Sequence, residues 1–417
     1  MSDKNIFEKY ESEVRSYCRI FDEELDYAKG TIIKDVKGKE YIDFFCGAGA
    51  LNYGHNNPYI KEKIIEYIQN DKIMHALDMY TKAKEEFIEY FEENILKKRN
   101  LNYKIQFPGP TGTNAVEAAL KLARKVKKRT NIWCFMGCFH GMTLGSIALT
   151  TDKDARQGAG IPLEYAQHIP APYMFENFDV INYMQTILDD DHSGIEKPAA
   201  IILETVQAEG GIHVFSVEFL QSLRKFCDDN DILLIVDDIQ VGCARCGTFF
   251  SFERANIVPD IVTMSKSIGG YGMPFAITLL KPELDIWTPG EHNGTFRGNQ
   301  IAIVAAKAGL EFFNENNIEK ETVRKGKLVE KFLCEQIKPL NEKFEIRGIG
   351  LIWGIDVHNE DLAKRISKKC FESGLIIERA GRKNEVVKIM PPLVINDETL
   401  DKGLKILKEV IEKEVKA

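Results

Sequence analysis

An amine and two carboxylates stand where three apolar segments of this 417-residue chain end. Glu204 and Asp237 close their apolar runs, and Lys266 follows its run directly after Ser265. Short continuous apolar runs that alternate with helical segments predict parallel strands in a sheet covered on both faces. Because ligands bind at the carboxyl ends of such strands, we expect these side chains to share one crevice.

The position of Lys266 suits a nucleophilic amine. Partial burial at a strand end favours the neutral amine, which can attack a carbonyl carbon and form a Schiff base. The surrounding segment, Ser265-Lys266-Ser267-Ile268-Gly269-Gly270, would fit an ordinary surface turn if it stood alone. The acids predicted at the neighbouring strand ends favour a cofactor site over that alternative.

A loop rich in Gly and Pro at residues 107–114 leads into a strong helix-forming segment at residues 115–124. Backbone N–H groups at a helix N-terminus bind anions, and Gly112 would let a ligand approach them closely. A simple N-cap by Thr113 or Asn114 explains the same residues, and the pattern alone does not separate the two interpretations. The P-loop spacing of glycines and lysine is absent, which excludes a Walker motif.

Phe139 and His140 lie between glycines, just after a predicted buried strand at residues 132–135. An aromatic side chain in that place suits a platform on which a flat ring can stack. Taken singly, such a residue is more often part of the core. The interpretation as a platform therefore depends on the lysine and the acids nearby.

Composition argues against several classes of function. The net charge of −8, without a basic run that contains aromatics, gives no basis for nucleic-acid binding. No apolar run approaches the roughly 20 residues of a membrane span, and the N-terminus lacks the apolar region of a secretory signal. The nine cysteines are scattered, which favours reduced thiols. We therefore expect a cytoplasmic protein that binds neither nucleic acid nor membrane.

Two short motifs invite interpretations that their surroundings do not support. Gly47-Ala48-Gly49 follows a predicted strand, but Asn52 stands where a dinucleotide-binding fingerprint needs its third glycine. Cys243-Ala244-Arg245-Cys246 has the spacing of a redox motif or of half a zinc site. The other half would have to come from Cys134 and Cys138, whose spacing suits zinc less well. We expect small loop residues here and no metal site.

The remaining segments predict an α/β large domain and a smaller lobe. We expect an N-terminal arm and hairpin at residues 1–57, a large domain at 58–330 and a C-terminal small domain at 331–417. The individual elements predicted are an arm or helix at 6–29, a hairpin at 31–44, helices within 58–98, 217–228, 302–312 and 362–373, strands at 347–357 and 385–390, and a last helix rich in Lys and Glu.

A Schiff-base lysine, an acid for a ring nitrogen, a stacking aromatic and an anion site are together what pyridoxal 5'-phosphate requires. Over nearly its whole length the chain resembles class III aminotransferases of fold type I. The resemblance rests on Asp237-Asp238-Ile239-Gln240, where Asp238 replaces the usual Glu, and on the segments 265–270 and 292–299. It implies a mainly parallel sheet in the large domain and a smaller α+β lobe made from N- and C-terminal segments.

The resemblance assigns cofactor roles residue by residue. Lys266 would carry pyridoxal 5'-phosphate as a Schiff base and then move the proton. Asp237 would keep the ring nitrogen protonated, and Gln240 would reach the phenolic oxygen of the ring. The other residues implied at the cofactor are Gly112 and Thr113 at the phosphate, Phe139 on the ring face and Glu204 at the adjacent strand end. Thr295 would reach the phosphate bound by the neighbouring subunit, which implies a homodimer or higher homo-oligomer with shared sites.

Within the family, four segments resemble members that transfer the amino group of L-glutamate to the aldehyde of L-aspartate 4-semialdehyde; they are 13–19, 49–56, 107–125 and 289–299. The implied substrate-binding residues are Arg19, Tyr53, Glu209 and Lys388. Glu209 resembles a gate glutamate that pairs with an arginine in one half-reaction and releases it in the other. Many members have that arginine where Lys388 stands, and lysine offers a point charge in place of a fork. Our hypothesis is that Arg19 takes part of that duty.

Three alternatives stay open at this point. Other members of the family act on ornithine, acetylornithine or 4-aminobutyrate, and Lys388 argues mildly against these. An aminomutase related to the glutamate 1-semialdehyde type would need no external amino acceptor. A non-catalytic protein that binds pyridoxal 5'-phosphate need not keep both Lys266 and Asp237. The first two, like the favoured interpretation, imply small amino acid or oxo acid substrates.

Overall fold

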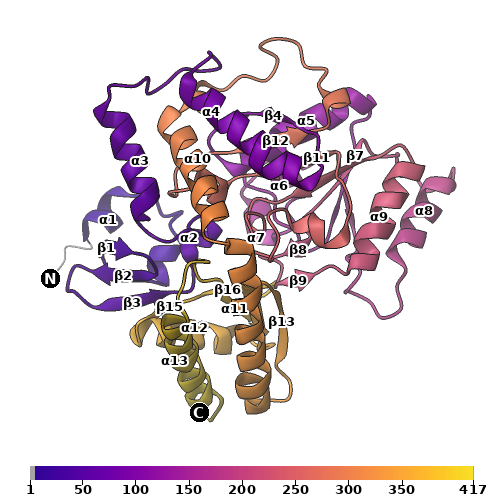
Figure 1. Cartoon of the computed structure of the whole chain (residues 1–417). Helices are drawn as coiled ribbons and strands as arrows, with labels where there is room; N and C mark the ends of the chain where they lie inside the picture. Colours follow the sequence, from indigo (N-terminus) through magenta and orange to yellow (C-terminus); the bar gives the residue numbers. More distant parts are fainter. Residues whose placement is uncertain (1–4, 417) are drawn as a thin grey trace.

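A seven-stranded sheet forms the centre of the molecule, in the order β4-β12-β11-β10-β7-β5-β6 (Figure 1). The computed structural model describes residues 5–416. Strands β11, β10, β7, β5 and β6 are mutually parallel, whereas β12 is antiparallel to both of its neighbours. The α/β fold with a mainly parallel sheet is thus confirmed. The strands are β4 (Lys104–Gln106), β5 (Ile132–Phe135), β6 (Ala166–Ile169), β7 (Ala200–Leu203), β10 (Leu233–Asp237), β11 (Ile261–Met264) and β12 (Ile277–Leu280).

The apolar strands predicted from sequence lie in the middle of this sheet. Every residue of β5, β7, β10 and β11 is buried, as continuous apolar runs require. Helices cover the sheet, and the central ones carry a wide apolar stripe. The helices around it are α3 (Pro58–Gln69), α4 (Lys82–Phe91), α5 (Gly112–Lys127), α6 (Leu144–Leu149), α7 (Lys153–Gln157), α8 (Val180–Asp189), α9 (Val217–Asp229) and α10 (Gln300–Glu315).

The N- and C-terminal segments meet in a second sheet, in the order β1-β2-β3-β15. The C-terminal strand β15 (Leu375–Ile376) pairs in parallel with β3 (Glu40–Asp43) of the N-terminal hairpin. In Figure 1 these N-terminal strands lie beside the yellow C-terminal helices, away from α8 and α9. The other two strands of this sheet are β1 (Leu25–Lys29) and β2 (Ile32–Asp35). The helices of the N- and C-terminal segments are α1 (Asn5–Tyr10), α2 (Cys46–Gly49), α11 (Ile318–Phe332), α12 (Glu360–Glu372) and α13 (Asp397–Lys416).

A third sheet, in the order β13-β14-β17-β16, belongs wholly to the C-terminal part. Here the structure corrects the prediction of one strand at 347–357: it contains a hairpin of β13 (Glu345–Ile349) and β14 (Ile352–Asp356). The turn is at Gly350, whose φ of +57° favours glycine and whose added Cβ would lie 2.3 Å from the Arg245 carbonyl oxygen. The other strands are β16 (Glu378–Ala380) and β17 (Val386–Ile389), and β8 (Val206–Gln207) pairs with β9 (His213–Val214) elsewhere.

Two other local predictions need correction. The predicted helical region 58–98 is broken between α3 and α4, where residues 70–81 form an exposed loop. The helix after the Gly-rich loop begins one residue after Thr111, so Thr111 and neither Thr113 nor Asn114 is its N-cap. Asn114 contributes by accepting a hydrogen bond from the Thr111 backbone N–H, at 3.1 Å.

Within residues 5–416, none of the helices combines the length and the apolar character that a membrane crossing requires.

Arg245 ties three distant segments together at the base of the large domain. Its guanidinium is fully buried and donates to the carbonyl oxygens of Leu351 (2.8 Å) and Pro391 (2.6 Å) and to Asn52 Oδ1. These acceptors compensate much of the cost of burying the charge, although Arg245 Nε has no partner among the described residues. Arg245 therefore couples the N-terminal loop, the β13–β14 turn and the segment after β17.

Replacing Arg245 with Ala should destabilise the fold strongly. The substitution leaves three buried acceptors without a donor and opens a cavity, so we expect a loss of about 3–5 kcal/mol. Arg365→Ala, which removes an exposed pair with Glu414, should cost no more than about 0.5 kcal/mol. Thermal and urea unfolding of both variants would test this, and equal losses would contradict the role given to Arg245.

Candidate active site

The carboxyl ends of β5, β7, β10 and β11 open onto a cavity of about 190 Å³. Parallel neighbours end at the same edge of a sheet, so residues far apart in sequence converge there. The structure brings together eight of the residues predicted from sequence. The full lining is Gly112, Thr113, Phe139, His140, Gly141, Glu204, Glu209, Asp237, Ile239, Gln240, Val241 and Lys266.

Lys266 follows β11 and begins the short helix η5 (Lys266–Gly269). Its φ of +53° lies in the left-handed region, which a residue with a side chain adopts only when its surroundings impose it. Burial lowers the pKa of the Lys266 amine, the carboxylate of Glu209 opposes that shift, and Lys388 adds to it. The lowered pKa increases the neutral fraction of the amine, which is the form that can act as a nucleophile or a base.

Asp237, the last residue of β10, is held by two hydrogen bonds. Its Oδ1 accepts from the Ile239 backbone N–H (3.1 Å), and its Oδ2 lies 2.7 Å from His140 Nδ1. His140 is fully buried, and its backbone N–H donates to Thr150 Oγ1 at 2.9 Å. The sequence singled out His140 only as a neighbour of the aromatic platform. Its contact with Asp237 shows that the imidazole orients this carboxylate.

Glu204 supports the loop that carries Phe139. Its Oε1 accepts from the Phe139 backbone N–H at 2.8 Å. Burial raises the pKa of Glu204 to about 7; His140 opposes this shift and Asp237 adds to it. The Phe139 ring lies on the cavity wall and is partly exposed, as a surface for stacking must be.

The N-terminus of α5 forms the polar end of the cavity. The Thr113 hydroxyl lies 2.9 Å from Ser146 Oγ and 2.5 Å from Thr143 Oγ1. The first backbone N–H groups of a helix have no partner within the helix, and the helix dipole favours an anion near them. Glycine is needed at position 141, since an added Cβ would lie 2.7 Å from Thr113 Oγ1. The arrangement suits a phosphate group.

Glu209 stands between Gln240 and Lys388. Its Oε1 accepts from Gln240 Nε2 at 3.1 Å and lies 2.8 Å from Lys388 Nζ. Burial raises the pKa of Glu209, but Lys388 and Lys266 outweigh it and hold the pKa below its usual value. The Oε1 atom of Gln240 is buried on this wall without a partner among the described residues. An unsatisfied acceptor of this kind marks a place where a ligand can bind.

Lys388 also contacts a second carboxylate that the sequence analysis missed. Its Nζ lies 2.6 Å from Oε1 of Glu378, and the side chains of both residues are almost completely buried. A signal was present in the sequence, because Glu378 directly ends the apolar run 375–377. An acid at the end of a buried strand needs a partner, and Lys388 on the neighbouring strand supplies it.

The structure does not bring four predicted residues to the cavity wall, and one of them, Lys388, is fully buried beside Glu209. Tyr53 is buried in the core, with its ring edge-on to Phe312 at 6.0 Å. Thr295 is exposed at the start of η7 (Thr295–Gly298). Arg19 is exposed on η1 (Tyr17–Arg19) and forms an ion pair with Glu13 at 2.5 Å. The roles suggested for these residues stay predictions.

Tyr17, two residues before Arg19, is the part of the N-terminal arm that approaches the charged groups. Its ring packs on Phe45 with centroids 5.1 Å apart. Burial raises the pKa of the Tyr17 hydroxyl to about 12, with contributions from the carboxylates of Glu378 and Glu209. The arm therefore brings Tyr17 near these carboxylates, and the substrate-binding role given to Arg19 stays a prediction.

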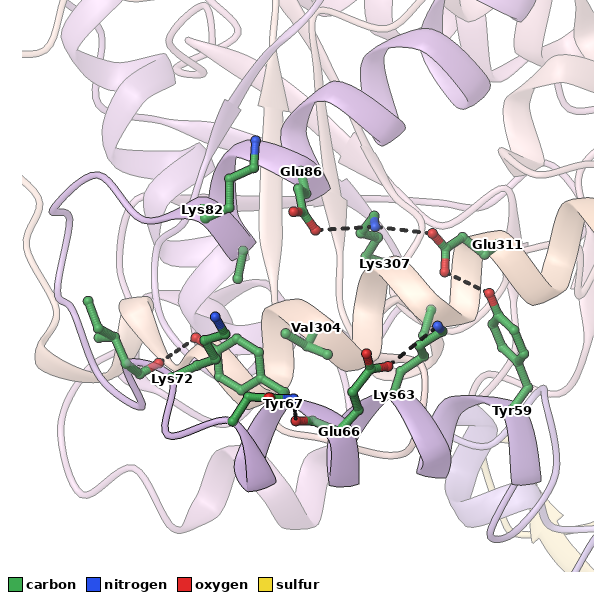
Figure 2. Close-up of a pocket in the computed structure, with 14 residues that line it drawn as sticks. Tyr59, Lys63, Glu66, Tyr67, Lys72, Lys82, Glu86, Val304, Lys307 and Glu311 are labelled. Carbon is green, nitrogen blue, oxygen red and sulfur yellow. Dashed lines mark hydrogen bonds and ion pairs between the residues drawn. The ribbon is translucent and has the colours of Figure 1, made fainter.

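Other candidate sites lack reactive groups. All nine cysteines are free, and the only metal-like group found among the described residues is Glu345, Asp356 and His358, where Arg347 already pairs with both acids. A larger cavity of about 450 Å³ lies between α3, α4 and α10 (Figure 2). In it, Lys307 pairs with Glu86 and Glu311, and Lys63 pairs with Glu66.

Comparison with known proteins decides the family. The model of class III aminotransferases matches residues 18–411. The chain belongs to the class III aminotransferase family. The diaminobutyrate--2-oxoglutarate transaminase of Streptomyces coelicolor is 52% identical to it over 413 residues, 98% of each chain. Proteins of the same name from Halalkalibacterium halodurans (52%, covering 98% of this chain and 96% of the relative) and Marinococcus halophilus (51%, 99% and 97%) are equally similar.

Solved structures agree on the fold of this class III aminotransferase. An ornithine aminotransferase from Toxoplasma gondii has a TM-score of 0.86 at 23% identity, covering 99% of this chain and 95% of that one. A transaminase from the marine bacterium Virgibacillus has a TM-score of 0.88 at 19% identity, covering 100% and 99%. The fold type predicted from sequence is confirmed.

Class III aminotransferases use pyridoxal 5'-phosphate, and the cavity of this one has the groups to hold it. The helix start at Gly112 and Thr113 suits the phosphate, and the unpartnered Gln240 Oε1 faces a place for a ligand. Asp237 can hold a proton on a ring nitrogen, and the amine of Lys266 can form the covalent link.

Asp237→Asn should lower kcat/KM by roughly 10²- to 10³-fold, because a neutral amide does not stabilise a positive charge on a ring nitrogen. The fold should stay intact, since the amide can still bond to His140 and to the Ile239 N–H. Asp238→Asn is the matched control: Asp238 accepts from the Ser251 backbone N–H at 2.9 Å and does not line the cavity. Steady-state kinetics and melting temperatures of both variants would check this. Similar losses of activity in both would contradict it.

Proposed function

We propose that this class III aminotransferase interconverts L-aspartate 4-semialdehyde plus L-glutamate and L-2,4-diaminobutyrate plus 2-oxoglutarate. The observation that carries the proposal is the 51–52% identity, over almost complete chains, to several proteins named diaminobutyrate--2-oxoglutarate transaminase. The likeness to ornithine aminotransferase is much weaker at 23% and concerns the fold. An ornithine, acetylornithine or 4-aminobutyrate substrate is the second candidate.

The chemistry divides between the cofactor and the protein. When bound, pyridoxal 5'-phosphate supplies an electron sink for the negative charge left when a proton leaves the carbon that bears the amino group. Lys266 removes that proton with its neutral amine and can return it at a different carbon. Its lowered pKa supports this role, since a base of ordinary lysine pKa would be protonated at neutral pH.

The other residues orient the reactants and control charge. Asp237 keeps a positive charge on the ring nitrogen and is itself oriented by His140. The N-terminus of α5 receives the phosphate, and Phe139 covers one face of the ring. Lys388 is the cation that a substrate carboxylate can reach, provided that the carboxylate of Glu209 moves away from it.

The first test is a half-reaction of the purified holoenzyme, followed through the absorption of the cofactor. Addition of L-2,4-diaminobutyrate should remove the visible band, and 2-oxoglutarate should restore it. Lys266→Ala should show no turnover, whereas Lys369→Ala, on the exposed face of α12, should behave as the wild type.

Each alternative has its own outcome in that experiment. A band that ignores diaminobutyrate but responds to ornithine or 4-aminobutyrate would favour the second candidate. Product formed from an amino-aldehyde without any oxo acid would indicate an aminomutase. A protein that binds the cofactor and responds to no amino acid would refute an enzymatic role.

We further propose that the active unit is at least a homodimer in which Thr295 completes the phosphate site of the neighbouring subunit. Thr295 is exposed, and its neighbour Phe296 is 64% exposed. The loop 74–80 lies beside this segment, since the Met74 carbonyl accepts from the Gln300 N–H at 3.0 Å. The loop adds four large apolar residues that solvent reaches: Met74, Leu77, Met79 and Tyr80. An exposed apolar patch of this kind beside a polar loop supports contact with a second copy.

A subunit-mixing experiment tests the shared site. Thr295→Ala should weaken cofactor binding about tenfold, the loss of one phosphate hydrogen bond, and Lys266→Ala should be inactive. In a hybrid dimer of the two variants, one site combines an intact Lys266 with an intact Thr295 of the other chain, so wild-type cofactor affinity should return at that site. A hybrid that keeps the weak affinity of Thr295→Ala would refute the shared site, and a monomer in light scattering would refute the dimer.

We also propose a cytoplasmic location and a division of the chain near residues 57 and 330. The free cysteines support the first, because reduced thiols persist in a reducing compartment. The separate sheet β13-β14-β17-β16 supports the second. Limited proteolysis would test the boundaries through the sites that are cut first.

A further inference from the structure

Lys388 is a single buried cation with two buried carboxylates as partners. Its ammonium lies 2.8 Å from Glu209 Oε1 and 2.6 Å from Glu378 Oε1. Glu378 and Lys388 are direct register partners on the antiparallel strands β16 and β17. Glu209 comes from the loop after β8 and lines the cavity, whereas Lys388 and Glu378 are buried and do not line it. A substrate therefore reaches Lys388 only in place of Glu209.

The charge of this cluster depends on Glu378. With both carboxylates ionised, the cluster of Glu209, Glu378 and Lys388 has a net negative charge; with Glu378 protonated it is neutral. Burial raises the pKa of Glu378 to about 7, against the effect of Lys388 and with the help of Glu209. The same surroundings hold the pKa of Glu209 below its usual value, so Glu378 is the carboxylate that takes up the proton.

The substrates of the proposed function differ in charge, so the charge of this cluster affects their binding differently. L-Glutamate has two carboxylates and one ammonium group, and L-2,4-diaminobutyrate has one carboxylate and two ammonium groups. When a substrate carboxylate replaces Glu209 at Lys388, Glu378 stays in contact with the lysine. An ionised Glu378 already neutralises Lys388 and weakens its attraction for the incoming carboxylate, whereas a protonated Glu378 leaves the full positive charge.

We propose that Glu378 is a positioning residue that acts through Lys388 to set substrate preference: its negative charge weakens binding of the dicarboxylic substrates relative to diaminobutyrate. This inference rests on the proposed function. A site with one cation and one carboxylate, such as an Arg–Glu pair, is neutral. Here Glu378 adds a second carboxylate beside Lys388, so the site is negative when both carboxylates are ionised.

Other titratable groups also lie near Glu378 or across the cavity from it. Tyr17 on η1 has its pKa raised to about 12, so it stays neutral, and burial lowers the pKa of Lys266 on η5. Helix α12 packs on β16, and the titratable residue on its buried face is Cys370, whose thiol pKa burial raises. Glu204, across the cavity, has a pKa of about 7 as well. A pH profile of the wild type alone therefore does not identify Glu378, and a variant is needed.

The test compares half-reactions of the wild-type holoenzyme and Glu378→Gln, measured by stopped-flow absorbance from about pH 6 to about pH 9. For the wild type, the apparent Kd of L-glutamate should rise above about pH 7, as Glu378 loses its proton, and should level off about tenfold higher by about pH 9. In Glu378→Gln that rise should disappear, and L-glutamate should bind about tenfold more tightly at about pH 9 than in the wild type. The Kd of diaminobutyrate should change in the opposite direction or stay constant.

Two controls separate charge from structure. Glu372→Gln removes an exposed carboxylate of α12 that pairs with Lys369 and should leave both profiles unchanged. Glu378→Asp keeps the acid but withdraws it by one methylene, so the midpoint of the L-glutamate profile should move even if Glu378→Gln does not fold. An unmoved midpoint in that variant would overturn the proposal.

The remaining outcomes distinguish this inference from the function on which it rests. Wild-type enzyme that ignores diaminobutyrate would refute the proposed function. Wild-type enzyme that reacts with both substrates, while Glu378→Gln keeps the same ratio of affinities and the same pH slope, would overturn the role of Glu378. A loss of kcat without any change in the two Kd values would overturn it as well, since it would indicate a structural role.

Discussion

The burial of charge at the carboxyl ends of four parallel strands is the constraint on which this structure depends. Strands β5, β7, β10 and β11 are wholly buried, yet the chain places acids, a histidine and a lysine at or just after their carboxyl ends. In such a poorly solvated place each charged group needs a partner. Asp237 has His140, Glu204 has the Phe139 N–H, and Glu209 has Lys388. The network of partners determines which groups are charged at neutral pH.

The C-terminal sheet has a direct part in the chemistry because it supplies the counter-charges. The loop that carries Glu209 is held by three hydrogen bonds from this region. The Gly381 N–H donates to the Glu209 carbonyl (2.9 Å), and the Arg347 guanidinium donates twice to the Gly211 carbonyl (3.0 and 3.1 Å). Lys388 reaches the same carboxylate from β17. A shift of the small sheet relative to the large one would therefore change both the position of Glu209 and the electrostatics of the cavity.

Much of the site could be predicted because its signals are local. An apolar run that stops at an acid or a lysine identifies a buried strand and its functional end, and this holds for Glu204, Asp237 and Lys266. The Gly-rich loop before α5 is local in the same sense. The hairpin at Gly350 was missed because the run 347–357, although it contains three glycines, fits one strand by its apolar pattern. Only the close approach of the Arg245 carbonyl to Gly350 identifies the turn.

The sequence by itself predicted the mainly parallel sheet from its apolar runs, and its resemblance to class III aminotransferases implied the family and the cofactor. It also placed Glu204, Asp237 and Lys266 together at the strand ends, whereas the catalytic roles given to them stay predictions. Only the tertiary structure decided which charges meet. It paired Lys388 with Glu378 as well as with Glu209, and it turned Tyr17 and not Arg19 toward that cluster. These contacts join segments that are far apart in the sequence or on different strands. Their distances depend on how the strands and sheets pack, which no local pattern encodes.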